Sequence, residues 1–331
     1  MTGAAGLPVG VIGVGSLGFH HARILREVAG ARMVGVYDAN AERAAQVATE
    51  LGVPAYSSLD ALLGDIEAAV VAVPTTDHAE VALAAIDRGV HLLIEKPIAV
   101  TIEEADRILE AAGKRGVLVG TGHVERFNAA LRACEPYLDG PRFIESHRLA
   151  PFNPRGTDVA VVLDLMIHDI DLVLGLVDRK VTAVDAVGVP ILTPSVDIAN
   201  ARLRFEGGAV ANITASRVSR ERMRKLRLFQ PSGYLSLDLG TGTGEFLRLN
   251  KGVALGHLAA GTPLQLENIV ERVELVGDGA EPLRAELEAW VAAVRGERKL
   301  VVSGEDGRRA LAVALEIVKR TEEHLASASV A

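Results

Sequence analysis

Residues 9–18 read Val-Gly-Val-Ile-Gly-Val-Gly-Ser-Leu-Gly, a short apolar run that ends in three spaced glycines. The apolar part is typical of a buried strand, and a helical pattern follows the last glycine. In such a strand–turn–helix unit, Gly13 permits the tight turn, Gly15 lets the backbone approach a diphosphate, and Gly18 brings helix and strand close. The sequence therefore predicts a dinucleotide-binding site near the start of the chain.

An acidic residue follows the second predicted strand at the spacing that such a site requires. Met33–Tyr37 is apolar, and it ends at Asp38, twenty residues beyond Gly18. A carboxylate at this place accepts hydrogen bonds from the adenosine ribose hydroxyls and repels a 2′-phosphate. The sequence therefore predicts NAD as the cofactor. NADP is the weaker alternative, and Asn40 and Arg43 nearby could accommodate its 2′-phosphate.

Strands and helices alternate through the first third of the chain. Apolar strands are predicted at 68–73 and 90–94, and a later helix opens at a capping box formed by Thr101 and Glu104. This alternation implies a parallel sheet that is covered by helices on both faces. Residues 1–122 are therefore expected to form a doubly wound Rossmann domain that binds NAD.

Beyond residue 122 the pattern changes to strands joined by tight turns. Gly207-Gly208 and Ser232-Gly233 are typical of hairpins, so an antiparallel sheet is expected, with one face available to a partner subunit. Residues 123–331 are predicted to form a second α/β domain for substrate binding and oligomerisation, whose last helix could pack back on the first. The predicted strands are 181–189, 197–205, 209–216, 225–230, 234–238 and 245–249.

The composition is that of an ordinary globular protein. Its 331 residues are 49% hydrophobic and 24% charged, and the net charge of −8 argues against nucleic acid and against an anionic membrane surface. With Cys134 as the single cysteine, an internal disulfide is impossible and a cysteine-based zinc site is not expected. The sequence has neither a basic leader nor an uncharged apolar run long enough to cross a bilayer, so a cytoplasmic location is expected.

A lysine follows the strand that ends at Ile94. Glu95-Lys96-Pro97 lies about eighty residues after the glycine turn, and the carboxyl ends of parallel strands border the crevice where such sheets bind ligands. Lys96 is therefore a candidate to orient an alcohol oxygen beside the nicotinamide ring and to stabilise the charge that develops on it. Taken by itself, the tripeptide is also compatible with a solvated turn.

A long helix predicted at 158–176 carries polar groups in an apolar stretch. Asp164 and His168 are four residues apart and share one helix face. A carboxylate orients a neighbouring imidazole and suits it to take a hydroxyl proton as a hydride leaves the same carbon. The alternative is an amphipathic helix with a solvated acidic edge, which would account for Asp169 and Asp171. No metal site is expected, because these side chains would make a poor one.

Together these motifs resemble the glucose–fructose oxidoreductase / inositol dehydrogenase / rhizopine catabolism (Gfo/Idh/MocA) family. The glycine turn, Pro74-Thr75-Thr76-Asp77-His78, Glu95-Lys96-Pro97 and Asp164-x-x-x-His168 occur in this order and spacing over nearly the whole chain. The resemblance implies a Rossmann domain, then an α/β domain whose large, open, mostly antiparallel sheet forms a homodimer or homotetramer.

The same resemblance implies roles for particular residues. Lys96, Asp164 and His168 would be the catalytic set, with His168 as the base, while Thr75, His78 and Glu95 would line the nicotinamide ribose. The predicted cofactor contacts are Gly13, Gly15, Ser16, Leu17, Gly18, Asp38, Pro74, Thr75, His78, Glu95 and Lys96.

A narrower resemblance concerns the substrate. Residues 122–128 and 164–171 resemble a group whose members oxidise the 3-hydroxyl of UDP-N-acetylglucosamine, a step toward lipid A or other amino sugars. One departure from the wider family supports this group, because Val161-Val162-Leu163 replaces the glycines that commonly precede the Asp–His helix. A nucleotide-sugar substrate is therefore expected.

Basic residues flank the predicted site and suit an anionic sugar. A diphosphate would need cations, which Arg126, Arg148 and Arg155 could supply. A second basic run could add to these cations, although a solvated loop and edge strand, where charge discourages aggregation, is the favoured interpretation of it. The run consists of Arg217, Arg220, Arg222, Arg224, Lys225 and Arg227. The predicted substrate contacts are Lys96, His123, Arg126, Asn128, Arg155, Asp164 and His168.

Two other functions stay open at this point. Oxidation of a free cyclitol such as inositol, or of a monosaccharide, would not need cations for a diphosphate. A regulatory protein that binds a dinucleotide without turnover belongs to another class, and the intact Lys96, Asp164 and His168 argue against it.

Overall fold

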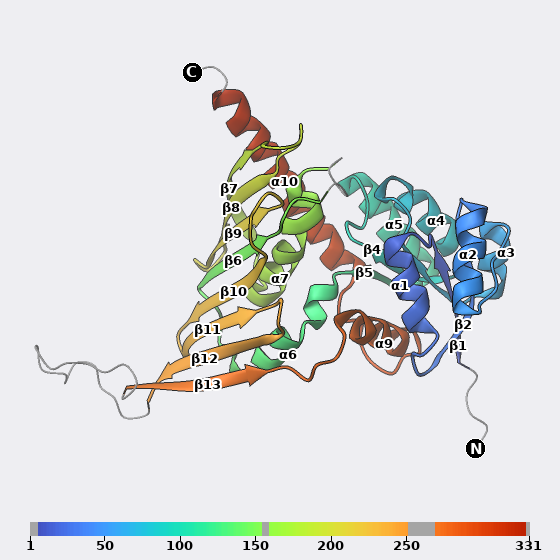
Figure 1. The fold of residues 1–331 in the computed structure, drawn as a ribbon, viewed down its shortest axis with the longest axis horizontal. Coiled ribbons are helices and arrows are strands. Elements are labelled where there is room, and N and C mark those ends of the chain that lie inside the picture. The colour runs from blue at the N-terminus through green and yellow to red at the C-terminus, as the bar shows by residue number, and fades with distance from the viewer. Residues whose placement is uncertain (1–5, 154–158, 251–268, 329–331) are drawn as a thin grey trace, which may run out of the picture. The chain divides into compact units, whose positions relative to one another are not determined.

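The computed structural model describes residues 6–153, 159–250 and 269–328 (Figure 1). The chain divides into two compact units, one formed by Met1–Phe127 with Glu281–Ala312 and the other by Asn128–Ala280 with Val313–Ala331. The carboxyl-terminal helix α10 (Gly304–Ala328) contributes its first part to one unit and its remainder to the other. None of the described helices combines the length and apolar character needed to cross a membrane.

The first unit is built on a sheet of five parallel strands in the order β2-β1-β3-β4-β5. Sheet order reverses between β1 and β3, and ligands bind such sheets at the carboxyl ends of the strands beside this point. The parallel Rossmann sheet predicted from the apolar runs is confirmed. Its strands are β1 (Leu7–Ile12), β2 (Ala31–Tyr37), β3 (Ala68–Val71), β4 (His91–Glu95) and β5 (Val119–Gly122).

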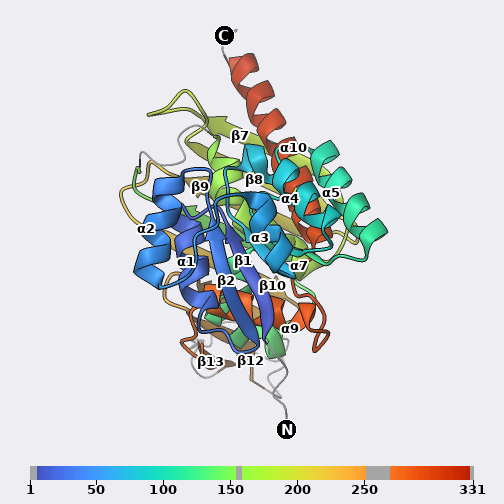
Figure 2. The ribbon, with the colours of Figure 1, turned by 90° about the vertical axis from the view of Figure 1, so that its right-hand side faces the viewer.

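Helices cover both faces of this sheet (Figure 2). On one face α1, α2 and α9 form a core with β1, in which Ile24, Val47 and Trp290 are buried. On the other face α4 packs against β3, β4 and α5. The helices of this unit are α1 (Ser16–Leu25), α2 (Ala41–Leu51), α3 (Leu59–Asp65), α4 (His78–Asp87), α5 (Ile102–Arg115) and α9 (Pro282–Val294).

The second unit holds a sheet of eight strands in the order β13-β12-β11-β10-β6-β9-β8-β7 (Figure 1). Every neighbouring pair is antiparallel except β6 and β9, so the mostly antiparallel sheet that was predicted is confirmed. Its strands are β6 (Phe143–Leu149), β7 (Val181–Val189), β8 (Ile198–Phe205), β9 (Val210–Ser216), β10 (Met223–Gln230), β11 (Gly233–Asp238), β12 (Thr243–Leu249) and β13 (Val270–Val276).

Helices α6 (Ala129–Cys134) and α7 (Ile167–Val177) pack on one face of this sheet, α6 on β11–β13 and α7 on β6 and β9. Successive side chains of a strand point to opposite faces, and β6 shows this alternation clearly. Ser146 and Arg148 are buried on the helix-covered face, whereas Glu145 and His147 are half-buried on the opposite face. The charged side chains of β6 are therefore divided between the two faces.

Three elements differ from the predictions. The helix expected at 158–176 is helical over Val161–Val177 of the described residues, and Val162–Met166 forms a π-helix; residue 158 lies outside the described part. Strand β13 was not predicted, and cross-strand ion pairs fix it to β12: Arg248 Nε lies 2.9 Å from Glu271, and Arg272 Nε lies 2.8 Å from Glu245. Helix α3, capped by Ser58, was also missed.

Candidate active site

Side chains beyond the end of β2 hold the glycine turn in shape. Val14 N–H donates to Asp38 at 2.7 Å, and Arg43 Nε donates to the Val14 carbonyl oxygen at 2.8 Å. Gly13 has φ +83°, and a Cβ there would lie 2.7 Å from a backbone nitrogen of the neighbouring segment. Gly15, by contrast, has open space where a Cβ would stand. The turn is thus preformed, and its backbone is open to a ligand.

A pocket of about 580 Å³ opens at this turn. The first turn of α1 contributes to its wall, and the positive end of the helix dipole favours an anion there. Asp38 already accepts from two N–H groups, and a carboxylate keeps further lone pairs for ribose hydroxyls. These residues therefore fit NAD. The lining consists of Gly13, Gly15, Ser16, Leu17, Asp38, Ala39, Asn40, Arg43, Ala72, Val73, Pro74 and Asp77.

Lys96 is half-buried at the end of β4, directly after a carboxylate that fixes its backbone. Glu95 Oε1 lies 2.7 Å from His21 Nε2, and Glu95 Oε2 accepts from Lys96 N–H at 3.1 Å. Burial would raise the pKa of Glu95, but the His21 hydrogen bond and the positive charge of Lys96 outweigh it and hold that pKa below its ordinary value. Gly122 on β5, directly opposite Glu95, leaves room for this carboxylate.

His78 connects two loops at the same edge of the sheet. Its Nδ1 lies 2.9 Å from the Pro97 carbonyl oxygen and its Nε2 lies 3.1 Å from the Val73 carbonyl oxygen. Burial lowers its pKa, and a neutral ring donates through one nitrogen only, so one of these contacts is a donated hydrogen bond. His78 is thus a buried link between the segments that follow β3 and β4. Its contact with the nicotinamide ribose stays a prediction, as does that of half-buried Thr75.

Asp164 lies in the π-helical segment and His168 in the first turn of α7, and both are half-buried. Turns of π-helix inside α-helices occur frequently at functional sites. Asp169 and Asp171 are each only 1% exposed, so the alternative of a solvated acidic edge is wrong for these two residues. Burial of Asp169 is compensated by Arg148, whose Nε lies 2.6 Å from its carboxylate.

A pocket of about 340 Å³ in the second unit adjoins Asp164. Four arginines and one carboxylate line it, so its electrostatic character favours an anion that also presents hydroxyl groups. The lining consists of Arg148, Leu149, Ala150, Pro151, Asn153, Asp164, Leu165, Arg217, Arg222 and Arg224.

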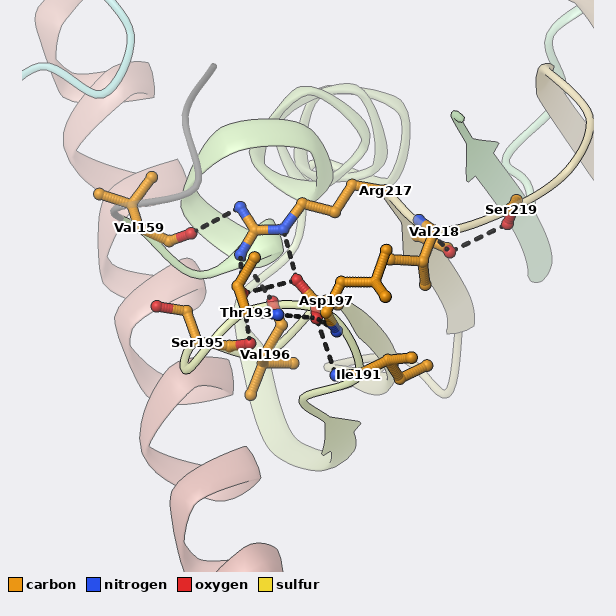
Figure 3. A network of polar contacts seen from close by, with 11 residues as sticks. Val159, Ile191, Thr193, Ser195, Val196, Asp197, Arg217, Val218 and Ser219 are labelled. Carbon is orange, nitrogen blue, oxygen red and sulfur yellow. Dashed lines mark hydrogen bonds and ion pairs between the residues drawn. The ribbon is translucent and has the colours of Figure 1, made fainter. Parts of the chain in front are cut away.

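Figure 3 shows the network that anchors the start of the helix carrying Asp164. Arg217 donates to Asp197 at 2.8 Å and to the Val159 carbonyl oxygen at 2.8 Å, and Val161 N–H donates to the Val196 carbonyl oxygen at 3.0 Å. Asp197 accepts three further N–H groups, from Ile191, Leu192 and Thr193, at 2.7, 2.6 and 2.9 Å. These hydrogen bonds of Val159 and Val161 therefore hold the start of the π-helical segment, Val162–Met166, in place.

This network strongly favours the ionised form of Asp197 over the protonated form. Burial would raise its pKa, but the Thr193 hydroxyl, the N–H groups of Ile191 and Thr193, and Arg217 outweigh burial and hold that pKa far below its usual range. Asp197 and Arg217 are 0% and 3% exposed. They form a buried ion pair with satisfied hydrogen bonds, the arrangement in which losing one partner is most costly.

Asp197→Asn is expected to lower the free energy of unfolding by about 3–5 kcal/mol, because the Arg217 guanidinium stays buried without its counter-charge. Urea denaturation followed by circular dichroism measures this change. The matched control is Asp185→Asn, since Asp185 is 68% exposed and lies 3.8 Å from Arg204. Such a surface pair contributes about 0–1 kcal/mol. Equal effects of the two substitutions would contradict an anchoring role for Asp197.

The remaining predicted substrate residues are placed as follows. Asn128 is buried and caps α6, because its side chain accepts from Ala130 N–H at 3.1 Å and donates to the Leu239 carbonyl oxygen at 2.9 Å. His123 is buried and Arg126 half-buried, while Arg155 lies outside the described residues. Of the predicted set, the described pocket of the second unit includes Asp164, and it does not include Asn128.

Three residues of the second basic run, Arg217, Arg222 and Arg224, line the pocket, although a solvated loop and edge strand was the favoured interpretation of this run. Strand β10 lies between β6 and β11 in the interior of the sheet, so the interpretation of this run as an edge strand is wrong. Arg217 is buried, and Arg222 and Arg224 line the pocket although both are exposed. The sequence did contain a signal for this position. Arg224, Leu226 and Leu228 are spaced two residues apart, so they lie on one face of the strand, and Arg224 shares its face with two apolar residues.

Comparison with known proteins finds family matches for both the amino-terminal and the carboxyl-terminal region of the chain. Residues 7–123 match a family model described as an oxidoreductase family with an NAD-binding Rossmann fold, and residues 139–236 match the GFO/IDH/MocA C-terminal domain. UDP-N-acetylglucosamine 3-dehydrogenase of Acidithiobacillus ferrooxidans is 40% identical over 96% of this chain and 97% of its own length. A solved structure of that enzyme superimposes with a TM-score of 0.88 at 37% identity, covering 97% of this chain and all of the other. The scyllo-inositol 2-dehydrogenase (NAD(+)) of Bacillus subtilis is 30% identical over 63% of this chain and 67% of its own length.

Proposed function

The chain belongs to the Gfo/Idh/MocA family of oxidoreductases and carries its NAD-binding Rossmann domain, and on this basis we propose that it oxidises the 3-hydroxyl of UDP-N-acetylglucosamine. The observation that carries the proposal is the arginine-lined pocket beside Asp164. A nucleotide sugar presents a diphosphate to such a pocket, whereas inositol or a free monosaccharide presents only neutral hydroxyls. The likeness to the A. ferrooxidans enzyme over nearly the whole chain supports the same substrate.

Residues of the first unit would hold the cofactor. The glycine turn would bind its diphosphate through backbone N–H groups, and Asp38 would accept hydrogen bonds from the adenosine ribose. When bound, NAD supplies the acceptor for the hydride that leaves the alcohol carbon. The chain itself then has to orient the alcohol and receive its proton.

We propose that Lys96, Asp164 and His168 divide these tasks. Lys96 would donate a hydrogen bond to the oxygen of the 3-hydroxyl and stabilise its developing negative charge. His168 would accept the hydroxyl proton, through Nε2 because its Nδ1 is buried, as the carbon–oxygen double bond forms. Asp164, one helical turn earlier on the π segment, would orient the imidazole and balance the positive charge that His168 gains.

We also propose that copies of the chain assemble through the face of the eight-stranded sheet that carries Glu145 and His147. An aromatic cluster on this face supports the proposal. The ring centroid of Phe229 lies 5.5 Å from that of Phe143 and 4.9 Å from that of Tyr234. Aromatic side chains are enriched in interfaces between subunits. A homodimer or homotetramer is the expected state.

NADH formation with NAD and UDP-N-acetylglucosamine tests the proposed function. The assay is run with and without 2-oxoglutarate, beside UDP-glucose, free N-acetylglucosamine and myo-inositol. Turnover confined to the UDP-amino sugar is the expected result. Turnover with myo-inositol and none with either UDP-sugar would replace the proposed substrate by a free polyol while keeping the family and its cofactor.

Asp38→Ala is expected to shift the ratio of the NADP and NAD dissociation constants toward NADP by about tenfold or more, because like charges in contact cost several kcal/mol. Affinity for NAD should also fall, since the Val14 N–H loses its acceptor. Isothermal titration calorimetry gives both constants. Asp60→Ala, which removes an exposed carboxylate paired with Arg88, is the control and should leave the ratio unchanged. If Asp38→Ala leaves the ratio unchanged as well, Asp38 does not select the cofactor.

A further inference from the structure

The four arginines that line the pocket beside Asp164 are not equivalent. Arg148 and Arg217 are each 3% exposed, and each is paired with a buried carboxylate: Arg148 with Asp169 at 2.6 Å and Arg217 with Asp197 at 2.8 Å. In Figure 3 the Arg217 guanidinium is directed at Asp197 and the Val159 carbonyl oxygen. The positive charges of these two arginines are therefore matched inside the protein.

Arg222 and Arg224 differ from this buried pair because both are exposed at the pocket. In the register of the antiparallel strands β10 and β6, Arg224 stands directly opposite Arg148. Residues directly opposite each other point to the same face, so Arg224 lies on the face of the sheet that carries Arg148. Arg222, one residue before β10, lines the same pocket as Arg224, so two exposed guanidinium groups lie at one pocket.

Asp164 limits where an anion can lie in this pocket. Its carboxylate repels a phosphate and accepts hydrogen bonds from hydroxyl groups, so a ligand with both kinds of group is oriented by the pocket. The charged part would lie toward Arg222 and Arg224, and the hydroxyl-bearing part toward Asp164. Two guanidinium groups match a diphosphate well, since each can donate two parallel hydrogen bonds to phosphate oxygens.

We propose that Arg222 and Arg224 bind the diphosphate of the nucleotide sugar and so determine substrate specificity, whereas Arg148 and Arg217 support the pocket from within. This assignment rests on the proposed function for the identity of the sugar. The anion site itself depends only on the arrangement of the four arginines.

Binding of UDP and of inorganic pyrophosphate to the NADH-saturated protein tests the assignment. NADH fills the dinucleotide pocket, so neither probe is measured there. Isothermal titration calorimetry is expected to show that Arg222→Met and Arg224→Met each weaken both probes by about ten- to a hundredfold, the loss of one charge-assisted contact. Uridine, which has no phosphate, should bind the variants and the unchanged protein alike. Arg224→Lys should lie between Arg224→Met and the unchanged protein, because it keeps the charge and loses the paired hydrogen bonds.

Arg220→Met is the matched control. Arg220 is an exposed arginine in the segment between β9 and β10 that also carries Arg222, and it is absent from the described lining of the pocket. It should bind both probes as the unchanged protein does. Unchanged affinities in both the Arg222 and the Arg224 variants would overturn the assignment. Weakened pyrophosphate binding in the variants, together with no oxidation of UDP-N-acetylglucosamine by the unchanged protein, would support the anion site and reject the proposed sugar.

Discussion

Lys96→Met is expected to lower kcat by about 10²–10³ or more, the effect of removing one donor that stabilises charge developing on oxygen. The backbone of Lys96 is fixed by Glu95, so the ammonium group starts from a defined place at the carboxyl end of β4. NAD would be held mainly by the glycine turn and Asp38, so its affinity should change by no more than a few-fold. Steady-state kinetics with UDP-N-acetylglucosamine and calorimetry with NAD measure the two quantities separately.

Lys114→Met serves as the control for Lys96. Lys114 is exposed on α5 and forms an ion pair with Glu110 at 2.6 Å, so the substitution removes a positive charge from the same unit without touching β4. Its kinetics should match those of the unchanged protein. Near-normal kcat in Lys96→Met would remove this lysine from the mechanism.

His168→Asn is expected to lower kcat by about 10²–10⁴, the contribution of a positioned general base. Asparagine keeps a polar side chain of similar size and loses the ability to take a proton at neutral pH. The pH–rate profile should therefore lose the limb that reports the base, while the affinity for NAD is unchanged. A profile identical to that of the unchanged protein would refute the role of His168.

His324→Asn is the control, because His324 lies near the carboxyl end of α10 and is not part of the described pocket lining. The double variant of Lys96 and His168 adds a further criterion. Groups that act in one chemical step give losses that are strongly non-additive. The double variant should therefore lose much less than the product of the two single losses.

The Rossmann sheet could be predicted from the sequence because its strands are buried on both faces. Runs such as Ala68–Val71 are fully apolar, and glycine turns and capping residues mark the ends of the neighbouring helices. Strand β13 escaped prediction because Val270 and Val273 are three residues apart, which breaks the alternation of a half-exposed strand. Ion pairs with β12 fix its position, and such pairs are invisible without the fold.

The catalytic candidates could be named from the sequence, but their supports could not. The π-helical segment leaves no signature in residue type, since it is a change of hydrogen-bond register within an apolar stretch. The contact of His21 with Glu95 joins residues 74 positions apart. Burial of Asp169 beneath Arg148 likewise depends on β6 packing against the helix, which sequence spacing does not reveal.

The Arg217–Asp197 network has a consequence for the protonation cycle of the enzyme. Because the pKa of Asp197 is depressed in the folded chain, its stabilising effect is complete above the ordinary aspartate value of about 3.9 and is lost only as the pH falls through its lower folded value. The proposed base, His168, would gain and return a proton in every turnover, while Asp197, which holds the start of the same helix through Arg217, keeps a constant charge. The start of the helix that carries Asp164 and His168 therefore keeps the same anchor at every pH at which Asp197 is ionised.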